Sequence, residues 1–586
     1  MRACRRIGPR SRRRRRRSSP GRSSGWAPAS YAPSTPRPRP VPWSSGRARR
    51  TDPPAPPAGR RGDSPSRGGP APGRRSRLCV AGVARTAGVP SQHRCNLGSA
   101  SRNLIPVNAR AARLGCGALR RAGRTDGRHC GRLEECVAAD LANYMTMAVP
   151  RYTSYPTAPH FHTGIDADTY ASWLAQLDAD APVSLYLHVP FCRQICWYCG
   201  CNMKLVGDRE EPLRDYVDVL DREIALVAGA LPARLKVSHI HWGGGTPTVL
   251  SGDDLAKVMA TLHRHFDVRG DAEVAIECDP RTFDAAKANA LGALGFNRAS
   301  FGVQEFDPRV QAAINRIQPP AMVAAAVEAL TAAGIERINF DLIYGLPHQT
   351  TEMLLDTVAQ CLGLGPSRIA LFGYAHVPWA AKRQRMIAAE ALPGASERFQ
   401  QAERAAEALV AGGMVAVGMD HFAFPDDPLA KAVRTRRLRR NFQGYTTDEA
   451  TTLIGMGSTS IGRTPFGYVQ NASETGAWAR AITEGRLAVA KGVCLSEDDV
   501  LRGRAIEELM CFGTLDMDDL ARRFEAQQDW ADDALAFLRP LEADGLVTID
   551  HGRVTVTSAG RPFVRIIASS FDRYITRGPC RHSAAV

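Results

Sequence analysis

The chain has 586 residues and a formal net charge of +17, but this charge is unevenly distributed. Residues 1–140 contain 32 Arg, no Lys and 6 acidic residues, a net charge of +26, whereas residues 141–586 carry 44 basic and 53 acidic residues, a net charge of −9. The basicity therefore gives no reason to assign a nucleic-acid partner to the larger part. No run of 18 or more apolar residues is present, which excludes a membrane-spanning helix, and no secretory start is recognisable, so we expect a cytoplasmic protein without a membrane partner.

Residues 1–140 form an Arg/Pro-rich extension with a continuous run of Arg at 12–17. We expect it to be disordered, because this composition cannot bury enough surface to offset the entropy of ordering. Three interpretations stay open: upstream DNA translated from a start codon placed too early, a basic arm for nucleic acid, and an organelle transit peptide. The GC-rich codons of Arg, Gly, Pro and Ala favour the first, with the true start near Met145 or Met147 or at an unusual start codon slightly upstream of them.

Apolar runs alternate with amphipathic segments after residue 180, which predicts βα units and a parallel sheet. Strands are expected at 184–189, 237–242, 273–278, 299–303, 338–343 and 369–374, and helices at 213–229, 253–266, 284–294, 308–315, 320–333 and 352–362. Six such repeats favour an α/β fold with an incomplete (β/α)6 barrel, and a doubly wound open sheet is the competing architecture. In either fold ligands gather at the C-terminal ends of the strands.

The pattern changes after about residue 400. A helix at 396–411, an irregular Gly- and aromatic-rich stretch at 412–470 and a helix at 473–484 are expected. Residues 496–570 then predict helices followed by short strands near 546–549 and 554–557, which resembles a winged helix. Because this unit has no marked basic excess, a packing or lid role is favoured over DNA binding. The predicted divisions are 1–140 (extension), 141–180 (substrate or lid segment), 181–395 (barrel), 396–490 (flanking segment) and 491–575 (C-terminal winged-helix-like domain).

The chain contains 15 cysteines, of which four lie within ten residues directly after the first predicted strand. These are Cys192, Cys196, Cys199 and Cys201. Zinc would require four ligands, usually from two separated pairs, and no second C-x-x-C pair is present. The spacing of Cys192, Cys196 and Cys199 instead suits a [4Fe–4S] cluster whose fourth iron is open to a substrate or cofactor.

The C-x-x-x-C-x-x-C pattern, with an aromatic residue before its third Cys, resembles the signature of the radical S-adenosylmethionine (SAM) superfamily. A second motif, the segment WGGGTPT at 242–248, follows at the end of the second predicted strand. Glycines let the backbone approach a small ligand closely. In this superfamily such a segment holds the amino group of SAM.

Further motifs make the chain similar to the oxygen-independent coproporphyrinogen III oxidase family over about residues 150–575. They lie at 150–157 (PRYTSYPT), 276–281 (IECDPR), 302–304, 315–316, 341–347 (DLIYGLP), 374–376, 418–423 and 441–447 (NFQGYTT). A related family of radical SAM haem chaperones shares the first three cysteines and the glycine segment. It typically carries Phe in place of Cys201 and lacks the segments at 150–157 and 441–447, so the oxidase is favoured. A third hypothesis, a winged-helix regulator with a redox cluster, would need a basic face on 496–570.

The resemblance implies an oxidoreductase of anaerobic haem biosynthesis, a coproporphyrinogen dehydrogenase. Reductive cleavage of SAM would give methionine and a 5′-deoxyadenosyl radical, which removes a hydrogen from the β-carbon of a propionate. Loss of CO₂ and one electron then leaves a vinyl group. Two such reactions convert coproporphyrinogen III into protoporphyrinogen IX. A one-electron donor of the flavodoxin or ferredoxin type and a monomeric state are also implied.

The resemblance assigns residues to cofactors and none to acid–base catalysis. Contacts to the SAM on the cluster are implied for Tyr186, Gly244, Glu277 and the backbone of Ile461. Contacts to a second SAM are implied for Tyr198, Gly245, Thr246, Gln304, Arg316, Asp341 and Ala375. Purely structural interpretations stay open for the polar members: caps or ion pairs for Glu277 and Asp341, a surface charge for Arg316, backbone pairing for Gln304, and interior packing for Tyr186 and His188.

The substrate of this family carries four carboxylates, so arginines able to bind bidentately are expected in its pocket. Arg151, Arg281 and Arg440 are the candidates.

Overall fold

A computed structural model describes residues 143–575 of the chain. The extension predicted at 1–140 lies outside the described residues. Among the described residues, no helix combines the length and the apolarity that crossing a bilayer would require.

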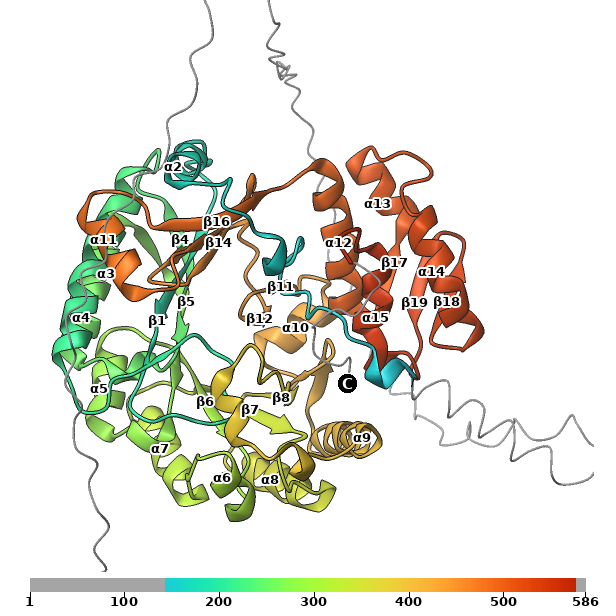
Figure 1. Cartoon of the computed structure of the whole chain (residues 1–586), viewed down its shortest axis with the longest axis horizontal. Coiled ribbons are helices and arrows are strands. Elements are labelled where there is room, and N and C mark those ends of the chain that lie inside the picture. Colours follow the sequence, from blue (N-terminus) through green and yellow to red (C-terminus); the bar gives the residue numbers. More distant parts are fainter. Residues whose placement is uncertain (1–142, 576–586) are drawn as a thin grey trace, which may run out of the picture. The chain divides into compact units, whose positions relative to one another are not determined.

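A single twelve-stranded sheet organises most of the described chain (Figure 1). Its six central strands are β1 (Val183–Val189), β4 (Lys236–Gly244), β5 (Asp267–Cys278), β6 (Arg298–Gln304), β7 (Arg337–Tyr344) and β8 (Arg368–Gly373), which lie side by side in that order. Each pairs with the next in parallel. All six strands predicted from the sequence are confirmed, and because their order follows the chain without reversing, the doubly wound alternative is excluded.

The flanking segments contribute strands that the sequence analysis missed. β13 (Thr452–Met456) pairs in parallel with β1 and leads through antiparallel pairs to β14 (Ile461–Thr464), β15 (Gly467–Asn471) and β16 (Val489–Cys494). At the other edge β10 (His421–Ala423) and β9 (Val415–Val417) follow β8. A separate two-stranded pair is formed by β11 (Arg439–Asn441) and β12 (Gly444–Thr446). The prediction of an irregular stretch at 412–470 was wrong, because strands of three to five residues are too short to show a clear period.

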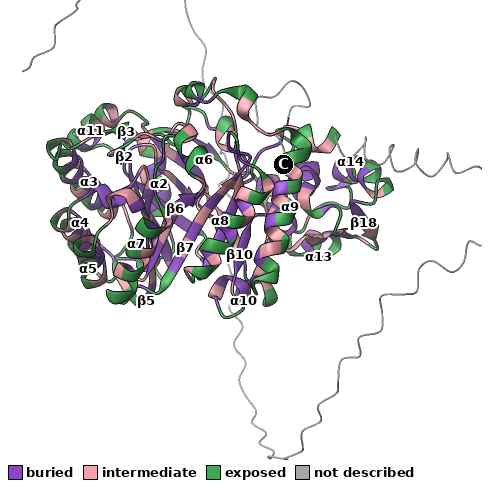
Figure 2. Cartoon of the chain, turned by 90° about the horizontal axis from the view of Figure 1, so that it is seen from below, coloured by how far each residue is buried: buried purple, intermediate pink, exposed green. Residues whose placement is uncertain are grey.

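Helices cover one face of the central strands (Figure 1). They are α3 (Glu211–Gly229), α4 (Gly252–His265), α5 (Ala285–Ala293), α6 (Pro308–Ala313), α7 (Pro320–Ala332), α8 (Thr351–Gly363) and α9 (Ala395–Ala411). In α4 the Ser251 side chain and Asp254 form a capping box, and Leu255, Val258, Met259 and Leu262 bury one helical stripe. Figure 2 shows this division, with buried strands and exposed outer helix faces.

The opposite face of the sheet is polar. On β7, Ile338, Phe340 and Leu342 are buried in the main core, so the alternation of a strand directs Asn339 and Asp341 to the other face. The same period places Tyr186 and His188 together on β1. Tyr186 lies opposite His241 in the register of β1 and β4. The residues available for chemistry therefore share one face.

The C-terminal unit contains three main helices and a small antiparallel sheet. The helices are α12 (Glu497–Phe512), α13 (Met517–Phe524) and α14 (Asp532–Ala543), and the strand order is β17 (Thr514–Asp516), β19 (Arg553–Val556), β18 (Val547–Asp550). The last two strands confirm the predicted pair, and His551 and Gly552 both have positive φ in the turn between them. The short helix α15 (Val564–Ala568) follows.

The segment after residue 143 joins both parts of the fold. Val149, Tyr152 and Tyr155 belong to the hydrophobic core of the C-terminal unit, and the Tyr152 hydroxyl donates to Asp572 at 2.9 Å. Farther along, α2 (Ala167–Ala175) buries Tyr170 and Trp173 in the core of the large sheet. One short segment thus contributes to two cores.

A buried carboxyl group ties α3 to the loop before β14. Glu223 accepts hydrogen bonds from the Gly457 N–H at 2.6 Å and from the Asn471 amide at 2.7 Å. Burial raises the pKa of Glu223 to about 7, in spite of these hydrogen bonds. The loop so held leads directly into Ile461.

We predict that Glu223→Gln changes the pH dependence of stability. The pKa of Glu223 is higher in the folded chain than in the unfolded chain, so its contribution is most favourable below about pH 4.5 and declines as pH rises toward 7, by up to about 3 kcal/mol. The melting temperature of the wild type should therefore fall, relative to that of the variant, between pH 5 and pH 8. Glu211→Gln, at the exposed start of α3, is the control. Parallel profiles for wild type and Glu223→Gln would contradict the prediction.

Candidate active site

The four clustered cysteines lie on the loop that leaves β1. The loop starts at β2 (Phe191–Cys192) and closes at β3 (Lys204–Leu205), with which β2 pairs in parallel. Its middle is fixed by a hydrogen bond from the Trp197 N–H to the Ile314 carbonyl at 2.9 Å and by one from the Asn315 amide to the Ile195 carbonyl at 2.7 Å. The loop is therefore held against the segment that follows α6.

The thiols differ in their surroundings. Cys192 and Cys196 are buried, whereas Cys201 is exposed. Burial raises the pKa of the Cys192 thiol to about 12, while a hydrogen bond from Cys201 lowers the pKa of the Cys199 thiol to about 6. Cys201 thus lies next to Cys199, and its backbone N–H donates to the Cys199 sulfur at 3.4 Å.

The chemistry of these thiols indicates which cofactor the loop could hold. Cys192, Cys196 and Cys199 are three soft thiolates on one loop, and cysteine thiolates are the ligands of iron–sulfur clusters. The residues present therefore fit a [4Fe–4S] cluster.

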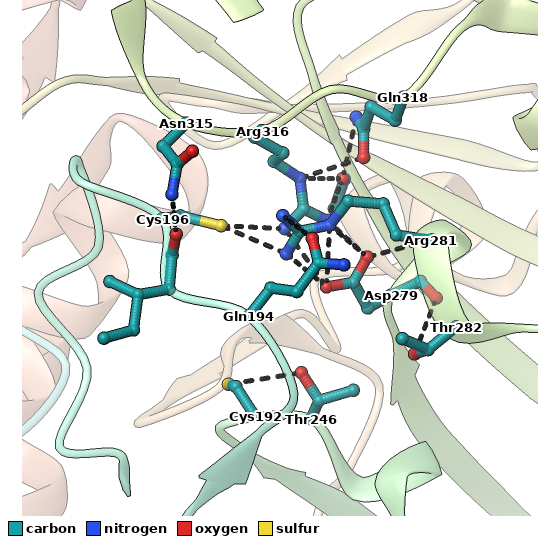
Figure 3. A network of polar contacts seen from close by, with 12 residues as sticks. Cys192, Gln194, Cys196, Thr246, Asp279, Arg281, Thr282, Asn315, Arg316 and Gln318 are labelled. Carbon is teal, nitrogen blue, oxygen red and sulfur yellow. Dashed lines mark hydrogen bonds and ion pairs between the residues drawn. The ribbon is translucent and has the colours of Figure 1, made fainter. Parts of the chain in front are cut away.

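Two buried guanidinium groups converge on Cys196 (Figure 3). Arg281 donates to the Cys196 sulfur at 3.2 Å and Arg316 donates to it at 3.3 Å. Asp279 lies between the two arginines and pairs with both of them, at 2.6 Å from Arg281 and 3.4 Å from Arg316. Although Asp279 is buried, Arg316 and Arg281 lower its pKa to about 2. The three side chains therefore carry a net positive charge beside the sulfur.

The glycine segment at the end of β4 packs directly against this loop. The Gly245 N–H donates to the Val189 carbonyl at 2.8 Å, and a Cβ at Gly245 would lie 2.6 Å from the Phe191 carbonyl oxygen. Gly244 has φ +119°, and a Cβ there would lie 2.8 Å from the His188 ring. Thr246 lies 3.4 Å from the Cys192 sulfur. Both glycines are required by close approach.

Glu277, at the end of β5, lies beside the glycine segment. It accepts a hydrogen bond from the Gly244 N–H at 3.1 Å and contacts His241 at 3.3 Å. Partial burial raises the pKa of such a carboxyl group, but these hydrogen bonds outweigh it and hold the pKa of Glu277 below its ordinary value. On the neighbouring strand, Tyr186 and His188 are linked through the tyrosine hydroxyl and Nδ1 at 2.9 Å.

Asp341 lies across the same interior. It accepts hydrogen bonds from Ser300 and Asn339, both at 2.9 Å, and burial raises its pKa to about 6. Asp341, Glu277 and His241 all line a cavity of about 240 Å³. The cavity runs along the polar face of the sheet.

The remaining predicted residues lie at the ends of strands or in the loops that follow them. Gln304 ends β6 with φ +67°, and its buried side-chain oxygen has no hydrogen-bond partner among residues 143–575. Ala375 follows β8, and the Gln384 amide joins its carbonyl at 3.1 Å to the carbonyl of Tyr198 at 2.7 Å. Ile461 starts β14, two strands from β1 in the sheet.

The arginines predicted for the substrate are dispersed. Arg281 donates to Asp279, Cys196 and Gln194. Arg440 donates to the carbonyls of Arg151 and Tyr152 and stacks over Tyr445. Arg151 donates to the Gly373 carbonyl at 3.1 Å. Of the three predicted arginines, Arg151 is thus the one whose side chain contacts the last residue of β8.

Sequence reasoning missed three residues of the site. Asp279 was within a recognised motif, but no pattern in the sequence indicated that it would pair with Arg316. His241 alternates with His239 along β4, which could have placed it on the polar face. Gln384 lies in a stretch without any motif, so nothing in the sequence pointed to it.

Comparisons with known proteins agree with this geometry. Residues 186–361 match the model of the radical SAM superfamily, and residues 495–563 match the HemN C-terminal domain. An oxygen-independent coproporphyrinogen III oxidase from Bradyrhizobium diazoefficiens is 51% identical over 449 residues, which is 76% of this chain and 100% of that protein. One from Escherichia coli is 38% identical and aligns with 73% of this chain and 93% of that protein. The solved structure of coproporphyrinogen III oxidase (HemN) from Escherichia coli superposes with a TM-score of 0.70 at 36% identity, covering 75% of this chain and 99% of that one.

The fold and the cysteine loop, together with these matches, define the class as a radical SAM protein, which implies a [4Fe–4S] cluster and SAM. Within that class, the chain belongs to the oxygen-independent coproporphyrinogen III oxidase family.

We predict that Gly245→Ala displaces the cysteine loop. The added Cβ would meet the backbone of Phe191, which cannot rotate away, so the loop must move at a cost of about 1–3 kcal/mol. Iron and sulfide per chain after anaerobic reconstitution should fall, as should the change in the electron paramagnetic resonance (EPR) spectrum on adding SAM. Gly270→Ala is the matched control, because a Cβ there meets no atom within 4 Å. Full iron content and an unchanged SAM response in Gly245→Ala would refute this account.

We predict that Arg281→Gln lowers the reduction potential of the cluster. Adding an electron increases its negative charge, so a buried cation nearby favours the reduced state. At roughly 8 Å and an effective dielectric constant of about 20, one charge contributes about 2 kcal/mol, or roughly 90 mV for one electron. A redox titration followed by EPR measures this shift.

The control for Arg281→Gln is Arg193→Gln. Arg193 adjoins Cys192 in the sequence, but its side chain pairs with Glu210 at 2.5 Å and with the Gly207 carbonyl at 2.7 Å. The reduction potential of the cluster in Arg193→Gln should match that of the wild type. Equal potentials for Arg281→Gln and wild type would remove the proposed electrostatic role of Arg281.

Proposed function

We propose that this protein converts coproporphyrinogen III into protoporphyrinogen IX by oxidative decarboxylation of two propionate side chains to vinyl groups. When bound, the cluster and SAM supply a 5′-deoxyadenosyl radical that removes the propionate hydrogen. The observation that carries the proposal is the packing of a three-cysteine loop against the glycine segment, with two guanidinium groups on Cys196, in a chain whose relatives are named for this activity. Those names support the oxidase rather than the haem chaperone.

Cys192, Cys196 and Cys199 would hold the cluster through three of its irons. The pKa of Glu277 is lowered, so its carboxylate is ionised at neutral pH and would accept hydrogen bonds from the amino group of SAM. Gly244 and Gly245 would let the backbone of the glycine segment lie close to SAM, as they let it lie close to His188 and Phe191. Tyr186 and the Ile461 backbone complete the first SAM site.

A second SAM is proposed on the residues around Arg316. The set is Tyr198, Gly245, Thr246, Gln304, Arg316, Asp341 and Ala375. The buried Gln304 oxygen, which has no hydrogen-bond partner in the described part of the chain, supports the assignment, because a buried polar group without a partner is costly unless a ligand satisfies it. The Gln384 bridge between Ala375 and Tyr198 supports it too, because it fixes two of these residues relative to each other.

A primary carbon radical attacks most C–H bonds, so the site must exclude water and competing groups. We propose that the six central βα units form an incomplete barrel and that residues 141–180 and 491–575 cover its open side. The contribution of the first of these segments to the cores of both parts supports this arrangement. The protein would act as a cytoplasmic monomer that accepts electrons from a flavodoxin or ferredoxin, without nucleic-acid or membrane partners.

The function is tested with anaerobically reconstituted protein, SAM, a reductant and coproporphyrinogen III. The wild type should release CO₂ and form protoporphyrinogen IX. Cys192→Ala, Cys196→Ala and Cys199→Ala should each lose turnover by more than 100-fold together with the visible absorption of the cluster. Cys201→Ala, the matched control on the same loop, should keep the absorption. Stable haem binding by the wild type without CO₂ release would overturn the oxidase proposal.

A further inference from the structure

The cysteine loop borders two other segments that are partly exposed. Gln384 and Arg383 donate to carbonyls of the loop at 2.7 and 3.2 Å, which places the segment after β8 beside it. Asn315 donates to another carbonyl of the loop at 2.7 Å, which places the residues after α6 beside it (Figure 3). The exposed side chains of the three segments are here called the loop face. The segments are residues 190–207, 314–320 and 376–389.

The loop face carries cations that the chain does not neutralise. Its three segments contain six Lys or Arg residues and no Asp or Glu, although residues 141–586 as a whole carry a net charge of −9. Three of the six pair with acidic groups of other segments, and these are Arg193, Lys204 and Arg316. The other three make no ion pair within residues 143–575, and these are Lys382, Arg383 and Arg385. Such a local excess of positive charge attracts an acidic partner.

Large apolar side chains are exposed beside these cations. Trp379 is 49% exposed and Met386 is 60% exposed. Of the six tryptophans within residues 143–575, Trp379 alone is exposed, and the others are buried or half-buried. Ile317, in the segment after α6, is 55% exposed. Trp, Met and Arg are the residues in which protein–protein interfaces are enriched, so the loop face has the composition of a contact surface.

The segment that carries the three cations has a fixed shape. The Gln384 side chain accepts a hydrogen bond from the Val377 N–H at 2.6 Å, while its amide holds the cysteine loop. This side chain is buried inside the 3₁₀ helix η4 (Lys382–Met386). Ile387, which follows η4, is buried in the small core that contacts the loop. The cations are therefore presented on a preorganised element, which lowers the entropic cost of binding a partner.

The position of the loop face indicates what such a partner would do. Cys192 and Cys196 are buried, whereas Cys199 is half-buried and Gly200 is exposed, so the cluster-binding loop is itself part of the surface. The proposed reaction requires that one electron reaches the cluster. Because the rate of electron transfer falls steeply with distance, a protein that donates the electron must dock near this loop.

We propose that the loop face docks an acidic one-electron carrier protein. Lys382, Arg383 and Arg385 would face carboxylates of the carrier. Trp379 and Met386 would contact apolar surface around its redox group. The carrier loses one electron and the cluster gains it, and no atom is transferred. The proposal rests on the proposed function and adds to it the surface at which the electron donor binds.

The test measures the binding of two acidic carriers, a bacterial flavodoxin and a [2Fe–2S] ferredoxin, to the anaerobically reconstituted protein by isothermal titration calorimetry. Lys382→Glu and Arg385→Glu should each raise the Kd about fivefold at low ionic strength, and the double variant about 20-fold, because repulsion replaces attraction. Trp379→Ser should raise the Kd about 10-fold, because it removes apolar contact area. Added NaCl should weaken binding by the wild type more than binding by the double variant.

Lys236→Glu is the matched control. Lys236 is exposed at the opposite end of β4, about 26 Å along the strand from Gly244. Its substitution should leave the Kd of both carriers unchanged. Turnover provides a second control: with dithionite as the reductant, all variants should release CO₂ as fast as the wild type. With a subsaturating reduced carrier, the Lys382, Arg385 and Trp379 variants should be slower.

Wild-type affinity in the Lys382, Arg385 and Trp379 variants would overturn the proposed docking surface, as would the absence of saturable binding of either carrier by the wild type. Tighter binding of a mixed-sequence RNA than of either carrier would also overturn it, because the positive charge would then serve nucleic acid. A wild type that forms no protoporphyrinogen IX with dithionite would overturn the proposed function instead.

Discussion

The close approach of two backbone segments, the glycine segment after β4 and the loop after β1, is the constraint on which the site depends. A side chain at Gly245 would overlap the Phe191 backbone, and one at Gly244 would overlap the His188 ring. Because these strands are neighbours in the sheet, the cysteine loop cannot move without the glycine segment. The loop that would bind iron and the backbone that would bind SAM are thus held in a fixed position relative to each other.

The charged side chains buried beside the cysteine loop are partly neutralised by one another. Arg281 and Arg316 are placed against a sulfur atom, and Asp279 between them offsets much of their repulsion. The cost of burying such groups is high unless each has a partner. A fixed cation stabilises the reduced state of a cofactor that accepts one electron, because the protein does not need to rearrange when the electron arrives. We infer that the network serves the redox state of the cluster as well as the shape of the loop.

The cavity of about 600 Å³ that is lined by β8, α9 and residues 558–565 has a different arrangement of charge. Arg151, Arg398 and Arg561 in its wall donate to the neutral carbonyls of Gly373, Tyr374 and Gly418. The segment near residue 150 and the C-terminal unit both contribute to this wall, and they also share a hydrophobic core. The shape of this wall therefore depends on the docking of parts that are distant in the sequence.

The sequence by itself determined the six central strands, the main helices between them and the loop with the three cysteines, because each has a local periodicity or spacing of sufficient length. It also determined the family, because the motifs at strand ends are specific. The tertiary structure alone decided that β13 extends the parallel sheet beside β1, since a five-residue strand is defined by its partners. It likewise decided that Arg281 turns to Cys196 while Arg151 joins Arg398 and Arg565, since a guanidinium at the end of a long flexible chain takes its place from distant partners that no local pattern encodes.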